Sequence, residues 1–398
     1  MIGFTPTDEQ RMLVETVRRF VREEIIPAED ELDPDAGALP ADVHRRLTAK
    51  TRAMGLWAWD APADVGGPGL DLVTQTLLAI EMAQHRGGLY TPCYGVFGGA
   101  GLAHLYEASE DQKQRYLYPT LRGEMHGFFA LSEPSGGSDP ARAIRTKAVR
   151  DGADWVLNGS KLWISNVVGA DYGIVVARTG PGRNGLTSFI VDVDAPGFTL
   201  VRVVKTLRRV HEATELTFED VRVPDANRLG PEGAGFTLAA ARLARQRIPY
   251  AAGCLGVAIA AHERAVEYAK IRETFGRTLA SQQGIQWMLV DNEIDLRNAR
   301  SAVLEAAAKA DGGADFRADA AIAKIVASEA ASRVVDRSMQ IHGGLGVAQD
   351  LPFERWYREM RIRRIGEGPN EVQRMIVARE LLGSAARTSA RTAQGDGE

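Results

Sequence analysis

The stretch DWVLNGSKLWIS, residues 154–165, decides the fold because apolar and polar residues alternate along it. A period of two is typical of a β-strand with one buried face, and Asn158 followed by Gly159 favours a two-residue hairpin turn. Four further runs share its bias towards β-branched and aromatic residues: DYGIVVAR, TSFIVDV, FTLVRVVK and ATELTFEDVRVP. Five or six strands without intervening helices predict an antiparallel barrel or sandwich over residues 125–236.

Both flanks of this zone have helical periodicity. Near the N-terminus, Thr7 and Gln10 have the spacing of a capping box, and apolar residues then recur every three or four positions. After the strand zone, the same spacing marks three long apolar faces, which predict an antiparallel helix bundle. We therefore expect an α+β multidomain protein with an N-terminal helical domain at residues 1–124, a β domain at 125–236, a C-terminal bundle at 237–383 and a disordered tail at 384–398.

Composition narrows the classes of function. The 398 residues are 45% hydrophobic and 25% charged, and 48 basic against 52 acidic residues give a net charge of −4. No basic stripe suggests a nucleic-acid partner, and no run of 18 apolar residues predicts a membrane span. Cys93 and Cys254 match no metal-ligand spacing and predict two reduced thiols. With an N-terminus that lacks the pattern of a signal peptide, they predict a cytoplasmic protein.

The chain has few self-sufficient catalytic groups. It has no P-loop, no cluster of Cys and His with metal-ligand spacing and no G-x-S-x-G turn, so we expect a cofactor and no metal. LSEPSGGSDP at residues 131–140 and WISN at 163–166 offer hydroxyls and bare backbone N–H groups to a planar, polar-edged ring or a phosphate. The alternative is two surface turns beside a core tryptophan. QIHGGLG at 340–346 could likewise be a glycine C-cap and turn.

One carboxylate stands in an unusual setting. In RIRRIGEGPNEVQR, residues 361–374, Glu367 lies between Gly366 and Gly368. Glycines on both sides would let a large group approach the backbone and carboxylate of Glu367 closely. The alternative is a polar loop between helices in which Pro369 opens the next helix.

The motifs ALSEPSGGSD, WISN, FEDVRVP, RETFG, QIHGGLG and EGPNEVQR occur in this order. Together they resemble the acyl-CoA dehydrogenase family of flavoproteins over residues 5–382, and the Glu-Gly-Pro loop is nearest to one subgroup of that family. The resemblance implies a middle antiparallel β-barrel, a C-terminal four-helix bundle, and a homotetramer built as a dimer of dimers. It also implies an FAD cofactor that reaches across a subunit interface.

The resemblance further implies a reaction. Glu367 matches the catalytic base, which takes the α-proton of an acyl-CoA thioester while flavin N5 takes the β-hydride, giving a trans-2-enoyl-CoA. An electron-transfer flavoprotein is the implied electron acceptor. Some members place the base on the helix that carries Arg247, but the corresponding residue here is Gln246, which cannot accept a proton at neutral pH. Glu367 is therefore the single candidate base.

The family's contact residues carry over position by position. Substrate contacts fall on Ser138, Arg247, Gly366 and Gly368. Gly366 replaces a tyrosine that walls the acyl pocket in several members, which suggests a wider pocket, and Pro369 replaces a threonine near the flavin. Cofactor contacts fall on Phe129, Leu131, Ser132, Gly137, Ser138, Trp163, Ile164, Ser165, Arg272, Thr274, Phe275, Gln282, Gln283, Gln340, Gly343, Gly344, Pro369 and Glu371.

Two other functions stay open at this stage. An oxygen-using flavin oxidase or monooxygenase of the same fold would act on a carrier-bound or small nitrogenous substrate. Retention of Glu367 favours the dehydrogenase, because a flavin monooxygenase needs no base for an α-proton. A helical scaffold that has lost FAD is disfavoured by the intact Ser132, Trp163, Ser165 and Arg272.

Overall fold

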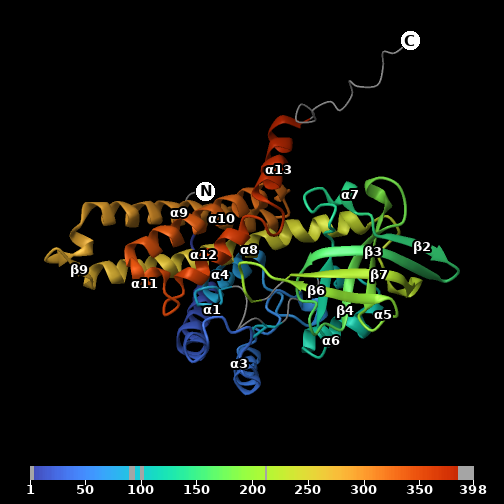
Figure 1. The fold of residues 1–398 in the computed structure, drawn as a ribbon, viewed down its shortest axis with the longest axis horizontal. Coiled ribbons are helices and arrows are strands. Elements are labelled where there is room, and N and C mark those ends of the chain that lie inside the picture. The colour runs from blue at the N-terminus through green and yellow to red at the C-terminus, as the bar shows by residue number, and fades with distance from the viewer. Residues whose placement is uncertain (1–3, 89–94, 99–102, 211–212, 384–398) are drawn as a thin grey trace, which may run out of the picture.

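The molecule is elongated, with a helix bundle along one part of its long axis and a β-sheet at the other end (Figure 1). The computed structural model describes residues 4–88, 95–98, 103–210 and 213–383. The tail at 384–398, expected to be disordered, lies outside the described residues, as does Cys93.

The N-terminal region is helical, as predicted. The Thr7 hydroxyl accepts the backbone N–H of Gln10, whose side chain accepts the N–H of Thr7, so the capping box is confirmed. All eleven residues of α4 are buried, because it packs against α1 on one side and against α8 and α9 on another. The elements are α1 (Asp8–Phe20), η1 (Val21–Ile25), α2 (Ile26–Asp30), α3 (Ala41–Ala53), η2 (Ala63–Val65), α4 (Leu72–Met82), η3 (Ala103–Leu105), α5 (Glu110–Gln112), η4 (Lys113–Leu117) and α6 (Tyr118–Arg122).

The middle region is a sheet, but the predicted closed barrel is wrong. Its strands run in the order β6-β7-β3-β2-β4-β5-β8, and among the described residues the end strands β6 and β8 do not pair. The sheet is also mixed, since β1 and β2 both run parallel to β4. Closure requires the two end strands to pair, and the alternation of apolar and polar residues along each strand does not predict which strands pair. The strands are β1 (Gly127–Ala130), β2 (Lys147–Asp151), β3 (Asp154–Ile164), β4 (Tyr172–Arg178), β5 (Leu186–Asp192), β6 (Phe198–Val204), β7 (Ala213–Pro224) and β8 (Arg228–Leu229), with α7 (Pro140–Ala143), η5 (Arg183–Gly185) and η6 (Asp225–Asn227) between them.

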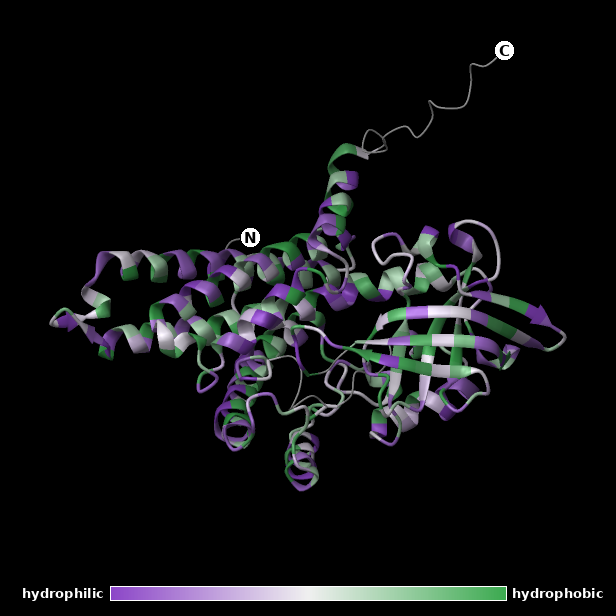
Figure 2. Ribbon diagram, in the orientation of Figure 1, coloured by the Kyte–Doolittle hydropathy of each residue, from purple (hydrophilic) through white to green (hydrophobic). Residues whose placement is uncertain are grey.

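The hairpin turn predicted at Asn158 and Gly159 is also wrong. Both residues lie inside β3, where the pairing with β7 shifts register by one residue. The Asn158 amide exchanges two hydrogen bonds with Asp220 of β7, at 2.9 and 3.0 Å. A side chain at Gly159 would collide with Thr146, so the glycine serves a bulge and a close approach rather than a turn. Hydrophobic and hydrophilic bands still alternate along the strands, as the sequence indicates (Figure 2).

The C-terminal region is a helix bundle. The long helices α8, α9 and α10 pack on one another, and the shorter α12 packs against α10. Their buried faces share one apolar core with α4, which fixes the N-terminal region against the bundle. The elements are α8 (Gly235–Ile271), β9 (Glu273–Thr274), β10 (Arg277–Thr278), η7 (Leu279–Ser281), α9 (Gln283–Asp311), α10 (Arg317–His342), α11 (Gly344–Val347), α12 (Phe353–Arg363) and α13 (Asn370–Leu382).

Ion pairs join the sheet to α12, the helix that leads into the Glu367 loop. Arg208, in the loop after β6, lies 2.8 Å from Glu359 of α12. Arg358 of the same helix donates to the carbonyl of Arg208 at 2.8 Å and pairs with Asp35 of the N-terminal region at 3.0 Å. All three regions therefore converge one to two turns before the Glu367 loop.

Candidate functional site

Glu367 lies in a tight loop between α12 and α13, with a backbone φ of +54°. The loop is closed at both ends, because Gly366 N–H donates to Ile362 at 3.0 Å and Asn370 N–H donates to Arg364 at 3.0 Å. A left-handed backbone is costly for a residue with a side chain, of order 1–3 kcal/mol, and persists where its surroundings enforce it. The carboxylate atom Oε2 is buried and has no hydrogen-bond partner, so it is free to receive a proton from a ligand.

Four donor contacts hold the two carbonyls that follow this carboxylate. The carbonyl of Glu367 accepts from Arg247 Nε at 3.4 Å and from Gln373 Nε2 at 3.3 Å. The carbonyl of Gly368 accepts from Gln373 Nε2 at 3.1 Å and from Lys324 Nζ at 3.0 Å. The peptide after Glu367 is therefore fixed from three helices, α8, α10 and α13.

Arg247 and Lys324 bring two positive charges to the back of this loop. Arg247 is 9% exposed; burial lowers the pKa of its guanidinium, and the charge of Glu367 opposes that shift. Lys324 is fully buried, and desolvation lowers its pKa to about 8. Sequence reasoning missed Lys324. The available signal was a lone charge in the alanine-rich run AAIAKIVA of α10.

The space beside the two glycines is filled by the protein itself. A Cβ on Gly366 would lie 2.8 Å from the hydroxyl of Tyr250, and a Cβ on Gly368 would lie 2.6 Å from the Gln373 amide. Tyr250 is on α8, one turn after Gln246. The two glycines thus leave room for the Tyr250 hydroxyl and the Gln373 amide to approach the loop backbone.

The fold brings the LSEP and WISN motifs together. The carbonyl of Ser132 accepts the N–H of Leu162 at 3.0 Å, so the residues after β1 lie alongside the end of β3. Trp163 is 56% exposed with a φ of +68°, which turns the indole out of the strand, while Ile164 is buried. The core tryptophan of the alternative interpretation is therefore excluded. Ser132 and Ser165 are half-buried nearby, so a planar ring would find an aromatic surface with hydroxyls beside it.

An ion pair under these motifs fixes the loop. Lys161 Nζ lies 2.8 Å from Glu133 and also donates to the carbonyls of Leu131 and Val176. Burial lowers the pKa of Lys161 to about 8. Burial alone would raise the pKa of Glu133, but Lys161 and the donors of Arg145 and Thr146 hold it below its usual value.

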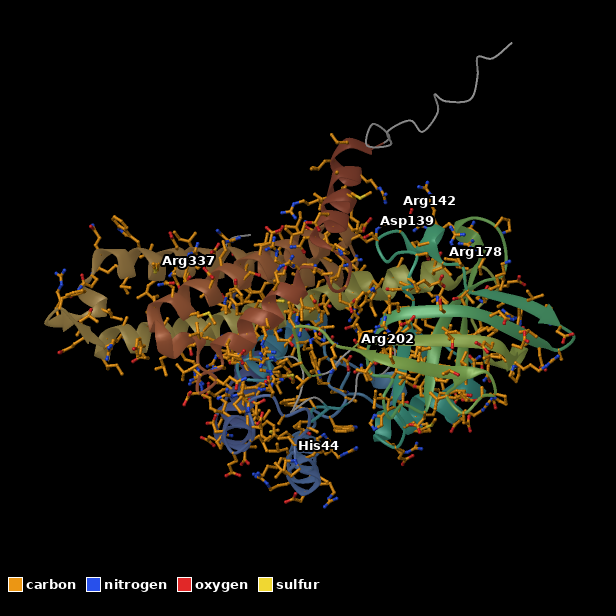
Figure 3. The ribbon with its side chains drawn as sticks, viewed as in Figure 1. His44, Asp139, Arg142, Arg178, Arg202 and Arg337 are labelled. Carbon is orange, nitrogen blue, oxygen red and sulfur yellow. The ribbon has the colours of Figure 1, made fainter. Side chains whose placement is uncertain are left out.

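Further along the loop, Arg178 clamps the segment that carries Gly137 and Ser138. Its guanidinium donates to the carbonyl of Ala141 in α7 at 2.8 Å and to that of Ile144, the residue after α7, at 2.9 Å. Figure 3 shows Arg178 beneath the helix, with Asp139 and Arg142 projecting from the outer surface. Ser138 is exposed, while the position of Gly137 faces the Ser132 hydroxyl, 3.6 Å from a Cβ placed there. The glycine-rich loop is thus held in place by contacts with the sheet and is not a free surface turn.

Phe129 is placed differently from its expected neighbours. The ring of His104 stacks on it at 4.5 Å, and the Arg242 guanidinium lies 5.2 Å from its centroid. Burial lowers the pKa of His104 to about 3, so the imidazole is neutral. Because the His104 ring and the Arg242 guanidinium already contact this ring, Phe129 is better suited to offer a cofactor its backbone than its ring.

Eight of the remaining predicted cofactor residues lie at the other end of the molecule. Arg272, Thr274 and Phe275 belong to the β9–β10 hairpin, with Gln282 and Gln283 at the start of α9 and Gln340, Gly343 and Gly344 at the end of α10. Figure 1 shows this hairpin and the sheet at opposite ends of the long axis. Phe275 is 98% exposed. Within one chain, the predicted cofactor residues near Trp163 and those near Arg272 therefore lie far apart. Pro369 and Glu371 lie instead beside Glu367, at the start of α13.

Comparison with known proteins covers almost the whole chain. Family models for the acyl-CoA dehydrogenase N-terminal, middle and C-terminal domains match residues 7–124, 128–221 and 233–382. An acyl-CoA dehydrogenase of Bacillus subtilis (strain 168) is 38% identical over 95% of this chain and 99% of its own length. The short-chain specific acyl-CoA dehydrogenase of Mus musculus mitochondria is 36% identical over 95% of this chain and 91% of its own. The structure of butyryl-CoA dehydrogenase from Megasphaera elsdenii superposes with a TM-score of 0.84 at 34% identity, covering 96% of this chain and all of that one.

Within the described residues, no helix is both long and apolar enough to cross a membrane.

Proposed function

The chain belongs to the acyl-CoA dehydrogenase family, whose members are FAD-binding oxidoreductases, and we propose that it oxidises a short acyl-CoA to the trans-2-enoyl-CoA. Bound FAD would supply the acceptor for the β-hydride. Trp163, Ser132 and Ser165 fit the flavin ring, since they offer an exposed aromatic face and hydroxyls side by side.

The observation that carries the proposal is the Glu367 carboxylate. Its Oε2 atom is buried without a hydrogen-bond partner, at the end of a backbone held by Arg247, Gln373 and Lys324. A carboxylate in this state can take the α-proton of a thioester, and a positioned base contributes about 10²- to 10⁴-fold to such a step.

The same residue offers a donor for the enolate oxygen. Within the described chain, the backbone N–H of Glu367 donates to no acceptor, while the carbonyl on its other side is held by Arg247 and Gln373. An N–H aimed at the thioester oxygen would stabilise the charge that develops when the α-proton leaves, at roughly 3 kcal/mol per donor.

Tyr250 supports a short acyl group. Its hydroxyl occupies the place that a side chain at Gly366 would take, so the wider pocket suggested by that glycine lacks support. The mouse relative is named for short chains and the Megasphaera elsdenii relative for butyryl-CoA, which agrees with this size.

We further propose an electron-transfer flavoprotein as the electron acceptor and a homotetramer in which the Arg272 end of one subunit completes the FAD site of another. A cytoplasmic location stays a prediction.

Anaerobic titration of the FAD-loaded protein with straight, branched and aryl acyl-CoAs tests the function. We expect the flavin band to bleach with butyryl-CoA and less readily with longer or branched chains. The Glu367→Gln variant should bind the same thioesters but reduce flavin about 10³-fold more slowly or worse.

Glu380→Gln changes an exposed carboxylate on α13, the helix that follows the Glu367 loop; it is the matched control and should behave as the unmodified protein does. A flavoprotein that no acyl-CoA reduces would redirect the search to oxygen-using chemistry on carrier-bound or nitrogenous substrates. Unchanged flavin reduction in Glu367→Gln would remove Glu367 from the role of base.

A further inference from the structure

Lys324 is a buried cation with an unusual set of partners. Its side chain is fully buried in α10, yet within the described residues its ammonium forms no ion pair with a carboxylate and donates to neutral oxygens. Its two acceptors are the carbonyl of Gly368 at 3.0 Å and the Asn370 Oδ1 atom at 2.7 Å. Buried lysines are almost always paired with a carboxylate, because removing an ammonium from water is costly.

Both acceptors belong to the loop that carries the proposed base. Asn370 is itself oriented by Ser328 and Glu329 of α10, which accept from its Nδ2 atom at 3.1 Å each. Its backbone N–H closes the loop on Arg364. Lys324 therefore fastens residues 368 and 370 to α10, immediately after Glu367.

The contact acts on the direction of the Glu367 side chain. Gly366 is fixed before it through Ile362, and the carbonyls of Glu367 and Gly368 are fixed after it. With both neighbours anchored, the left-handed backbone at φ +54° leaves one direction for the bond from Cα to Cβ. Without Lys324 the Gly368 carbonyl would be held by Gln373 alone, so this backbone could relax towards a commoner conformation, and the carboxylate would move with it.

We propose that Lys324 is a positioning residue that aims the Glu367 carboxylate, through the Gly368 carbonyl and the Asn370 side chain. The inference rests on the proposed role of Glu367 as the base. The charged and titratable groups that face Lys324 are Cys254 and Arg247 on α8, Glu367 in the loop, and Glu371 on α13. Burial raises the pKa of the Cys254 thiol to about 11, so that neighbour is uncharged near neutral pH.

The test uses Lys324→Met, which keeps the length of the side chain and removes both donated bonds, and Lys324→Gln, which keeps a neutral donor. Each FAD-loaded variant is mixed anaerobically with butyryl-CoA and, separately, with a 3-thia acyl-CoA. The thia compound can lose its α-proton to the base but has no β-hydrogen to transfer, so its enolate reports proton removal through a long-wavelength charge-transfer band on oxidised flavin.

For Lys324→Met we expect an unchanged FAD content and affinity for the thia compound within about threefold, because Lys324 is not among the predicted cofactor or substrate contacts. Flavin reduction should fall about 10²-fold, the loss typical of a 1 Å misplacement, and the charge-transfer band should weaken at least tenfold. Lys324→Gln should lie between this variant and the unmodified protein. Lys309→Met, which removes an exposed lysine on α9, should match the unmodified protein.

Rates and bands within twofold of the unmodified protein, after normalisation to bound flavin, would overturn the proposal. Loss of FAD or of thermal stability with unchanged rates per flavin would also overturn it, since that result marks a structural role. If Lys324→Met does not fold, Asn370→Ala removes the other end of the contact and is judged by the same readouts. A parent protein that no acyl-CoA reduces and that shows no band would remove the proposed function and this inference together.

Discussion

Among the described residues two lysines are fully buried, Lys161 in strand β3 of the sheet and Lys324 in helix α10 of the bundle, and they differ in the groups that surround the ammonium. Burial lowers the pKa of each to about 8. Lys161 has a carboxylate, Glu133, at 2.8 Å and two carbonyls besides. Lys324 has one carbonyl and one amide oxygen.

The difference separates two uses of a buried charge. Lys161 and Glu133 neutralise each other, and Glu133 also accepts the N–H groups of Arg145 and Thr146 that begin the next strand. This pair holds together the loop on which Ser132 lies. Lys324 has no carboxylate in direct contact among the described residues; it donates to two neutral acceptors, and the Glu367 and Glu371 carboxylates act on its charge from farther away. Burying the Lys324 ammonium without an adjoining carboxylate costs free energy, so we explain this residue by the loop that it positions.

The largest expected effect is at Lys161. Lys161→Met leaves the Glu133 carboxylate buried without its cation, so we expect the free energy of unfolding to fall by about 3–5 kcal/mol. Chemical denaturation of the variant against the parent protein measures this. A second change, Glu133→Leu in the same chain, should restore much of the loss. No restoration would show that Lys161 stabilises through the two carbonyls and not through the pair.

The pH dependence of stability sharpens the comparison. The folded-state pKa of Lys324 lies near 8, below the ordinary lysine value of 10.5. Between these values the unfolded chain binds more protons, so the free energy of unfolding rises with pH, at up to about 1.4 kcal/mol per pH unit from this one group. Denaturation of the parent protein and of Lys324→Met at pH 7.5, 8.5 and 9.5 isolates the contribution. Equal slopes in the two proteins would mean that Lys324 is already solvated in the folded state.

The smallest effect is expected at neutral pH for Lys324→Met. The variant gains from removing a buried charge that has no adjoining carboxylate among the described residues. It loses one of the two donors to the Gly368 carbonyl and the stronger of the two donors to the Asn370 oxygen. These contributions oppose each other, so we expect a change in unfolding free energy within about 1 kcal/mol. The same denaturation series provides the value. A loss comparable to that of Lys161→Met would contradict the distinction between the two lysines.

Much of the architecture could be predicted from local pattern. The capping box at Thr7 and the strands from DYGIVVAR to ATELTFEDVRVP appear where the periodicity indicates. The turn at Asn158 and Gly159 could not be predicted, because the partner of Asn158 is Asp220, 62 residues away, on a strand whose register is set by the whole sheet. The prediction of a closed barrel was wrong for the same reason, since closure depends on whether the distant strands β6 and β8 pair.

The candidate site divides in the same way. A carboxylate between two glycines, hydroxyls beside glycines, and a tryptophan in a strand are visible as residue types in order along the chain, so the sequence by itself determined the family, the cofactor class and the candidate base Glu367. Only the tertiary structure decided that Tyr250 fills the space beside Gly366 and that Lys324 holds the Gly368 carbonyl. These contacts join residues 44 to 116 positions apart. They are set by how α8 and α10 pack against one loop, and no local spacing records that.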